Sequence, residues 1–230
     1  MDINDFIGVI ELWGTLSNFV NIICEGRDES HGYNHMEKVA MNTLEILKDE
    51  MDQTLDVNEA QKIITDCITV AWLHDVADHK YDHDGKLKLK VKAFVRELLE
   101  NQDEVNLVMK IIDHISYSKE NNAINNGNPI DFENELGKTG AFIRHVVSDA
   151  DKLEALGKVG FIRMVEYTKE NYKKMNHKEI SSDELNKQVI QHSNEKLLRL
   201  KDYFIRTKTG REMARWKHQE LIEELEKLQK

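Results

Sequence analysis

The sequence predicts an all-α protein, and three observations support this fold class. The 230 residues include eleven glycines and a single proline, Pro129, so few residues interrupt helices. Apolar residues recur at three- and four-residue spacing over long stretches, as on the buried face of an amphipathic helix. Capping boxes, which favour helix starts, precede two of these stretches. At 40% hydrophobic and 32% charged residues, a chain of this length can bury one substantial core.

The apolar spacing predicts the helices in chain order. They are expected over approximately residues 4–24, 35–47, 57–74, 90–99, 105–115, 142–167, 182–204 and 209–228. Capping boxes at residues 56–59 and 181–184 mark the starts of the third and seventh helices. The charged stretch at residues 223–230 is expected to be a solvated face or a fraying end of the last helix.

Two polar segments are predicted to be loops. Residues 79–85 lack a period and end in glycine, directly after the third predicted helix. Residues 118–134 are rich in asparagine and contain Gly127 and Pro129, so they form the longest predicted loop. Binding groups tend to lie on loops that a rigid scaffold holds. The first loop is therefore a candidate to carry them, and the second is either a lid over a site or a mobile excursion.

The composition limits the kinds of partner. Lys+Arg 32 against Asp+Glu 42 gives a formal net charge of −10, which argues against a surface for nucleic acid or for an anionic membrane. The sequence has no apolar run that could span a bilayer and no pattern of a secretion signal. Cys24 and Cys67 have apolar neighbours and no metal-ligand spacing, which is typical of buried thiols in a reducing compartment. We therefore expect a cytoplasmic protein with a single domain over residues 1–230.

The end of the third predicted helix carries the most informative residues. An apolar run leads into His74 and Asp75, and imidazole and carboxylate are both good ligands for a borderline divalent cation. Asp78 follows His74 by one helical turn and would share its face. A buried histidine–aspartate pair is also a common hydrogen bond in a protein core, and on the dipeptide alone this interpretation is favoured over a metal site.

Two further groups of residues favour the metal. His31 and His35 are four residues apart, on either side of a glycine near the start of the second predicted helix. Asp149 and Asp151 flank a small residue within an apolar helix, where carboxylates are costly unless they are paired or bind a metal. Lys152, next to them, either neutralises an aspartate or reaches a substrate phosphate.

These motifs, in this order, resemble those of the HD-domain metal-dependent phosphohydrolase superfamily, especially its small stand-alone members that act on nucleotides. The motifs are Ser30-His31-Gly32-Tyr33-Asn34-His35, Leu73-His74-Asp75-Val76-Ala77-Asp78-His79-Lys80 and Asp149-Ala150-Asp151-Lys152-Leu153-Glu154-Ala155-Leu156-Gly157. The resemblance covers about residues 30–163. It implies an HD-domain helical bundle with additional C-terminal helices, residues 181–230, packed onto it.

The resemblance also implies a ligand set for one divalent cation. The expected ligands are His35, His74, Asp75 and Asp151. Relatives with a single aspartate in the third motif, followed by a basic residue and leucine, align it with Asp151, although Asp149 remains the alternative. Some relatives bind a second metal through two extra histidines, and the predicted helix over residues 90–99 has none, so a mononuclear site is expected. Manganese is the expected ion, with iron, zinc, cobalt, nickel or magnesium as alternatives.

The expected activity is hydrolysis of a nucleotide or another small phosphorylated metabolite. The expected catalytic residues are Asp78, His79 and Lys80, with Asp78 handling the attacking water. The expected substrate-binding residues are His31, His114, Asp149 and Lys152. For Lys80 a solvated loop lysine is the alternative, and for His114 it is a core histidine bonded to Asp113 or Ser116.

Two other functions compete with this one. A guanosine alarmone 3′-pyrophosphohydrolase would need a second acidic residue where this chain has His79, which counts against it. A non-catalytic module that binds metal and nucleotide to regulate a partner would not need Asp78. The absence of the second histidine set also weakens a di-iron oxygenase of the same fold. A homodimer is possible through the apolar stripe of the last helix.

Overall fold

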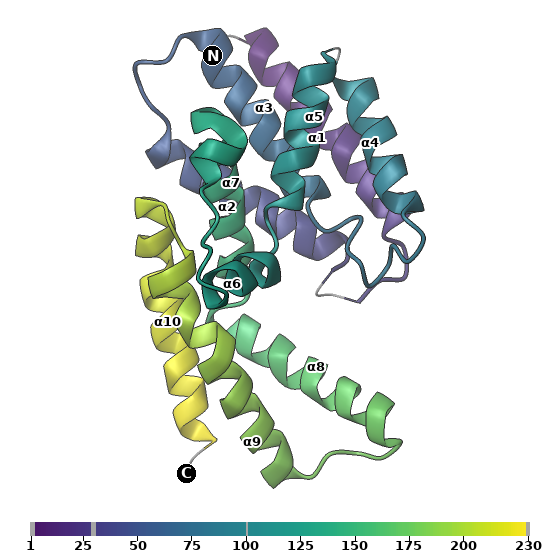
Figure 1. Ribbon diagram of the computed structural model, residues 1–230, viewed down its shortest axis with the longest axis vertical. Coiled ribbons are helices and arrows are strands. Elements are labelled where there is room, and N and C mark those ends of the chain that lie inside the picture. The colour runs from purple at the N-terminus through teal and green to yellow at the C-terminus, as the bar shows by residue number, and fades with distance from the viewer. Residues whose placement is uncertain (1–2, 29–30, 100, 229–230) are drawn as a thin grey trace. The chain divides into compact units, whose positions relative to one another are not determined.

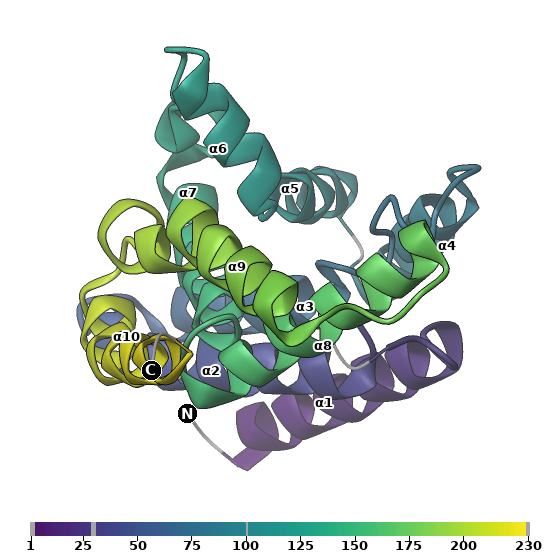
Figure 2. The same cartoon turned by 90° about the horizontal axis from the view of Figure 1, so that it is seen from below.

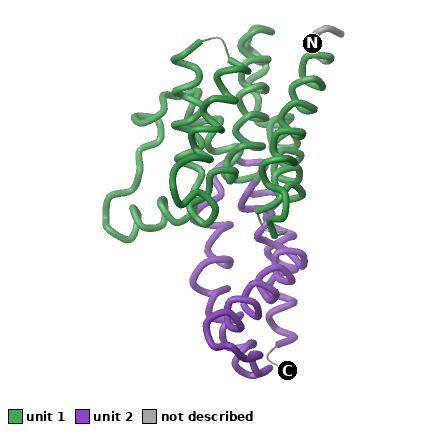
Figure 3. The backbone as a smooth tube through the Cα atoms, turned by 90° about the vertical axis from the view of Figure 1, so that its right-hand side faces the viewer, with its two compact units in different colours: residues 1–150 green, residues 151–230 purple. Residues whose placement is uncertain are grey.

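The computed structural model describes residues 3–28, 31–99 and 101–228 (Figure 1). The described residues form ten α-helices and two π-helical segments, and they contain no strand. The all-α prediction is therefore confirmed. Contacts within the chain divide it into two compact units, residues 1–150 and 151–230, with the boundary inside one long helix (Figure 3). That the two units make a single domain stays a prediction.

The first unit is built around one central helix, α3. Its helices are α1 (Ile3–Ile23), α2 (Tyr33–Glu50), α3 (Val57–Leu73), α4 (Lys86–Leu98), α5 (Gln102–Asp113), α6 (Tyr117–Asn125) and most of α7 (Phe132–Glu154). Helix α3 packs against α1, α2 and α5, and α4 packs against α5. Every residue of α3 from Asp66 to Leu73 is buried, as expected for a helix with neighbours on several sides. The C-terminal end of this buried helix carries His74.

The predicted start of α3 is confirmed in atomic detail. Asp56 is the N-cap, and its Oδ1 accepts a hydrogen bond of 2.9 Å from the backbone N–H of Glu59. The capping side chain satisfies one of the backbone N–H groups that have no partner in the first turn. In the second unit, Ser181 caps α9 (Ser182–His192) in the same way, through the N–H of Glu184 at 3.4 Å.

The longest predicted loop, residues 118–134, is wrong in its first half, which is helix α6, and in its last three residues, which begin α7. Ser116 caps α6, and the buried residue of this helix is Glu120, which forms an ion pair with Arg144 of α7. Helix α6 has no apolar stripe, because a charged side chain anchors it. A search for apolar periodicity therefore could not detect it, and the buried ion pair argues against a mobile excursion.

The predicted helix over residues 142–167 is also corrected, because it is divided into two helices. Helix α7 ends at Glu154, and α8 (Gly157–Asn176) begins at Gly157, whose φ is +75°. A positive φ is accessible to glycine at little cost, so this residue allows the turn between the helices. The apolar residues on both sides of the turn follow a helical spacing, which made the two helices look continuous in the sequence.

The second unit contains the remaining helices. They are the end of α7, α8, α9, the π-helical segments η1 (Ser193–Leu197) and η2 (Leu200–Phe204), and α10 (Lys208–Lys227). Helix α8 packs against both α9 and α10 (Figure 2). The single helix predicted over residues 182–204 is therefore an α-helix that continues into two π-helical segments.

Cys24 and Cys67 are buried and form no disulfide, as predicted. Burial raises the pKa of both thiols. Along the described ranges, no helix combines the length and the apolar character that crossing a bilayer requires.

Candidate metal centre

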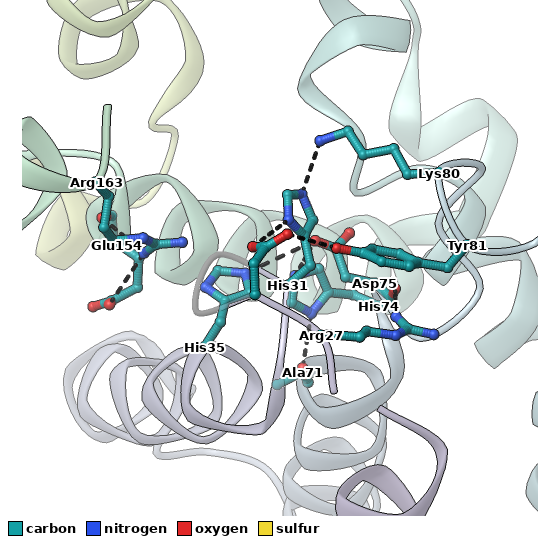
Figure 4. A network of polar contacts seen from close by, with 11 residues as sticks. Arg27, His31, His35, Ala71, His74, Asp75, Lys80, Tyr81, Glu154 and Arg163 are labelled. Atoms are coloured by element: carbon teal, nitrogen blue, oxygen red, sulfur yellow. Dashed lines mark hydrogen bonds and ion pairs between the residues drawn. The ribbon is translucent and has the colours of Figure 1, made fainter. Parts of the chain in front are cut away.

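His35, His74 and Asp75 bring three potential ligand atoms within 4.8 Å of one another (Figure 4). The Nε2 atoms of His35 and His74 lie 3.9 and 3.7 Å from Oδ2 of Asp75. The two imidazole rings meet edge-on, with an interplanar angle of 63° and centroids 5.4 Å apart. Within the described residues, this is the one such group that could hold a metal ion. Three of the four predicted ligands therefore come together.

The packing of α2 against α3 positions the two histidines. His35 lies in the first turn of α2, where its backbone N–H donates to the carbonyl of Gly32, the N-cap. His74 directly follows α3, and its Nδ1 lies 2.8 Å from the carbonyl oxygen of Ala71. Because a carbonyl only accepts, Nδ1 of His74 carries the proton, and in the neutral ring Nε2 then has the lone pair that could bind a metal. A backbone carbonyl that accepts from the other ring nitrogen commonly orients a metal-binding histidine.

The donor set fits the cation that the sequence resemblance implies. Two imidazole nitrogens and a carboxylate oxygen at this spacing suit a borderline divalent ion. The two histidines are buried, whereas the side chain of Asp75 is 26% exposed. The group is therefore accessible from solvent on the side of Asp75.

The turn after His74 holds Asp78 close to the ligand pair along the chain. The N–H of Asp78 donates to the carbonyl of Asp75 at 3.1 Å, and Oδ1 of Asp78 accepts from the N–H of Lys80 at 2.9 Å. The side chain of Asp78 is 22% exposed, so its carboxylate is accessible to water. His79, beside it, is almost fully exposed, with Nδ1 at 3.4 Å from Oδ1 of Asp78.

Lys80 and His31 belong to a polar network that also contains two residues that sequence reasoning missed. Nζ of Lys80 lies 3.1 Å from Nε2 of His31, and Nδ1 of His31 lies 3.4 Å from Oδ1 of Asp28. The hydroxyl of Tyr81 donates to Oδ2 of Asp28 at 2.8 Å. Burial lowers the pKa of His31, and the charge of Lys80 adds to this effect although nearby carboxylates oppose it. Burial and the bond to Asp28 raise the pKa of Tyr81 to about 12.

Arg27 is a third residue that sequence reasoning missed. Its guanidinium donates to the carbonyl oxygens of Asp75 at 3.2 Å and of Val76 at 2.7 Å, and it lies 4.1 Å from the centre of the Tyr81 ring. Backbone carbonyls have no signature in a sequence, so no pattern could have identified this contact. Asp28 and Tyr81 were equally hidden, because they meet only after the chain folds.

A cavity of about 410 Å³ lies between the end of α1 and the start of α2. Arg27 and Asp28 line it together with Tyr33 and Asn34. At Gly32, which also lines the cavity, the backbone packs closely against Asp28, because a Cβ at this position would lie 2.9 Å from the carbonyl oxygen of Asp28.

His114, which belongs to the same unit, lies outside this group of ligand atoms. His114 caps α5, where Nδ1 lies 2.7 Å from the carbonyl of Lys110 and the ring meets Phe132 edge-on. The expected alternative bond of His114 to Asp113 or Ser116 is therefore replaced by one to a backbone carbonyl.

The residues of the third motif lie on both sides of the boundary between the units. Asp149 is fully buried in the part of α7 that belongs to the first unit. Asp151 and the buried Lys152 belong to the second unit. Their predicted roles in metal and substrate binding stay predictions.

Comparison with solved structures identifies the fold. A protein from Lactobacillus plantarum is 20% identical, with a TM-score of 0.69 and 95% of each chain covered. YpgQ from Bacillus subtilis, solved in complex with ADP, is 22% identical, with a TM-score of 0.62 over 96% of this chain and 95% of that one. A protein from Bacillus thuringiensis described as an HD-superfamily hydrolase is 22% identical, with a TM-score of 0.64 and 96% of each chain covered.

The chain therefore has the fold of the HD superfamily, and the predicted resemblance is confirmed at the level of the fold. No family model and no curated protein matches the chain.

Proposed function

We propose that this protein is a metal-dependent phosphohydrolase that acts on a nucleotide or a related small phosphorylated metabolite. The observation that carries the proposal is the convergence of His35, His74 and Asp75, two of which are buried histidines at the ends of packed helices. Buried groups of this kind are costly to gather without a functional use. The shared fold with an HD-superfamily hydrolase supports the reaction class.

A divalent cation in this group would supply Lewis-acid chemistry, polarising a phosphoryl oxygen and lowering the pKa of water. His35, His74 and Asp75 would hold that cation, with Asp151 as the proposed fourth ligand. Asp78 would orient the attacking water and accept its proton, a role for which its partly exposed carboxylate is suited. The new bond joins the water oxygen to phosphorus while the bond from phosphorus to the leaving oxygen breaks.

The nucleotide part of the proposal rests on charge and on one relative. Lys80 projects from the loop beside the ligand pair and would offset negative charge on a phosphate, with His79 exposed next to it. His31, held between Lys80 and Asp28, would bind the substrate through its ring. The similar structure of YpgQ contains ADP, which favours a nucleoside phosphate as the substrate class. Manganese is the proposed ion.

The experiment is a release assay on the purified full-length chain. The protein is stripped of metal, Mn²⁺ is restored, and nucleoside mono-, di- and triphosphates are offered in turn. We expect release of phosphate or pyrophosphate that disappears in His74→Ala. Asp78→Asn should lower the rate by about 10²–10⁴-fold, the range for loss of a general base, while Mn²⁺ still binds.

His83→Ala is the matched control, because His83 is an exposed histidine of the same loop outside the ligand group. It should release product at the rate of the unsubstituted protein. If no product is released from any of the substrates while Mn²⁺ is bound stoichiometrically, the proposed hydrolase activity is wrong. The non-catalytic regulatory module would then be the favoured function.

A further inference from the structure

Arg27 makes an unusual pair of contacts with the main chain at the ligand pair. Its two terminal nitrogens donate to consecutive carbonyl oxygens, those of Asp75 and Val76. Among the described residues, its guanidinium meets these carbonyls and the face of Tyr81, and no carboxylate. The planar guanidinium therefore forms its hydrogen bonds with the backbone of the turn that carries the proposed ligands (Figure 4).

This turn needs donors, because it follows the end of α3. The last carbonyl groups of a helix have no N–H partner within the helix, and the same end carries partial negative charge. The carbonyl of Asp75 already accepts from the N–H of Asp78, and Arg27 adds a second, charged donor. Two forked hydrogen bonds to neighbouring carbonyls fix the orientation of the peptide group between Asp75 and Val76. That orientation sets the direction in which the Asp75 side chain leaves the backbone.

A second contact holds the guanidinium itself in place. Cζ of Arg27 lies over the ring of Tyr81, 4.1 Å from its centroid. The Tyr81 hydroxyl in turn donates to Oδ2 of Asp28 at 2.8 Å. Arg27 and Asp28 are adjacent in the segment after α1. This segment therefore contacts both ends of the stretch from Asp75 to Tyr81, through Arg27 at the first end and Asp28 at the second. The negative face of an aromatic ring attracts a cation, so this contact favours one position of the arginine.

We propose that Arg27 is a positioning residue that fixes the turn of His74 and Asp75 for a divalent cation. The inference rests on the proposed metal site and adds to it a residue outside the ligand set and outside the three sequence motifs. A lysine at this position would keep the positive charge but lose the fork that reaches two carbonyls. Loss of partners that orient metal ligands typically lowers metal affinity by about 10–100-fold.

The test is isothermal titration of the metal-free full-length protein with Mn²⁺, together with the melting temperature of the metal-free protein. Arg27→Lys should weaken Mn²⁺ binding at least tenfold. Arg211→Lys is the matched control, because Arg211 also donates to a backbone carbonyl, that of Ile205 at 3.0 Å, in the other unit. The control should bind Mn²⁺ as the unsubstituted protein does, and the two metal-free variants should melt within a few degrees of each other.

A second variant protects the test against a folding defect in Arg27→Lys. Tyr81→Leu keeps the arginine and removes the ring that steadies it, so Mn²⁺ affinity should fall by a smaller factor. Unchanged affinity in both Arg27→Lys and Tyr81→Leu, with Mn²⁺ bound by the unsubstituted protein, would overturn the role of Arg27 while leaving the proposed hydrolase intact. No Mn²⁺ binding by the unsubstituted protein would overturn both.

Discussion

The first unit contains two buried polar groups of opposite character. Arg144 and Glu120 are 0% and 2% exposed, and they form an ion pair in which one side chain neutralises the other. The guanidinium also donates to the carbonyl of His114 and lies over the ring of Phe132. The group of His35, His74 and Asp75 instead gathers three electron-pair donors around one point. The first group is therefore neutralised from within the protein, whereas the second has the donor atoms that the proposed cation requires.

The largest expected effect comes from breaking the ion pair. Arg144→Met removes the guanidinium that pairs with the buried carboxylate of Glu120, which should lower the free energy of unfolding by about 3–5 kcal/mol. Urea unfolding of the metal-free protein measures this change. The double variant Arg144→Met/Glu120→Leu should recover most of the loss, because two apolar side chains can replace a buried pair. A double variant as unstable as Arg144→Met would show that the pair does not act as a unit.

The second effect separates the two groups through metal binding. A ligand that binds only the folded state stabilises it by about 2.7 kcal/mol at a concentration of 100 Kd. Saturating Mn²⁺ should therefore raise the free energy of unfolding of the unsubstituted protein by this order, and of His35→Ala by far less. Urea unfolding with and without Mn²⁺ checks both. An equal increase in the two proteins would place the bound metal elsewhere.

The smallest effect concerns Asp66 of α3, a buried carboxylate that is only partly neutralised by a neighbouring cation. Its side chain is 3% exposed, and one partly exposed cation, Lys62, lies 3.3 Å from Oδ2, while Lys62 also meets Glu104 at 3.0 Å. Oδ1 of Asp66 has no hydrogen-bond partner among the described residues. Burial raises the pKa of Asp66 above its usual 3.8, although Lys62 opposes the shift.

The sign of the pH dependence follows from that direction. A carboxyl group whose pKa is higher in the folded state stabilises the fold below its unfolded pKa of 3.8, and this contribution is lost as the pH rises through the folded value. Asp66→Asn does not titrate, so its stability relative to the unsubstituted protein should increase from pH 4 to pH 7. Urea unfolding over this range measures the difference, and a difference independent of pH would contradict the shift.

The fold was largely predictable because most helices bury an apolar stripe. Helix α3, with its capping aspartate and its apolar run, is the clearest case. Helix α6 could not be found in this way, because its buried anchor is Glu120 and the partner Arg144 lies far along the chain. The division between α7 and α8 was missed because only the backbone of Gly157 marks it.

The candidate site was predictable where chemistry follows sequence spacing. His35, His74 and Asp75 were identified from their motifs, and the fold brings them together. Arg27 and Tyr81 were not, since one acts on backbone carbonyls and the other on a side chain 53 residues away. Contacts of this kind exist only in three dimensions.

The tight packing at Gly32 has a consequence for redesign of the protein. Any side chain at this position would collide with the carbonyl of Asp28, a backbone atom that cannot simply rotate away. A mutant library aimed at new substrates should therefore keep this glycine constant. Tyr33, the next residue, lines the neighbouring cavity but also forms hydrogen bonds with Ser17 and Glu37 and packs against Trp72. Asn34 lines the same cavity with an exposed side chain, so variation of the cavity wall can begin two residues after the constrained glycine.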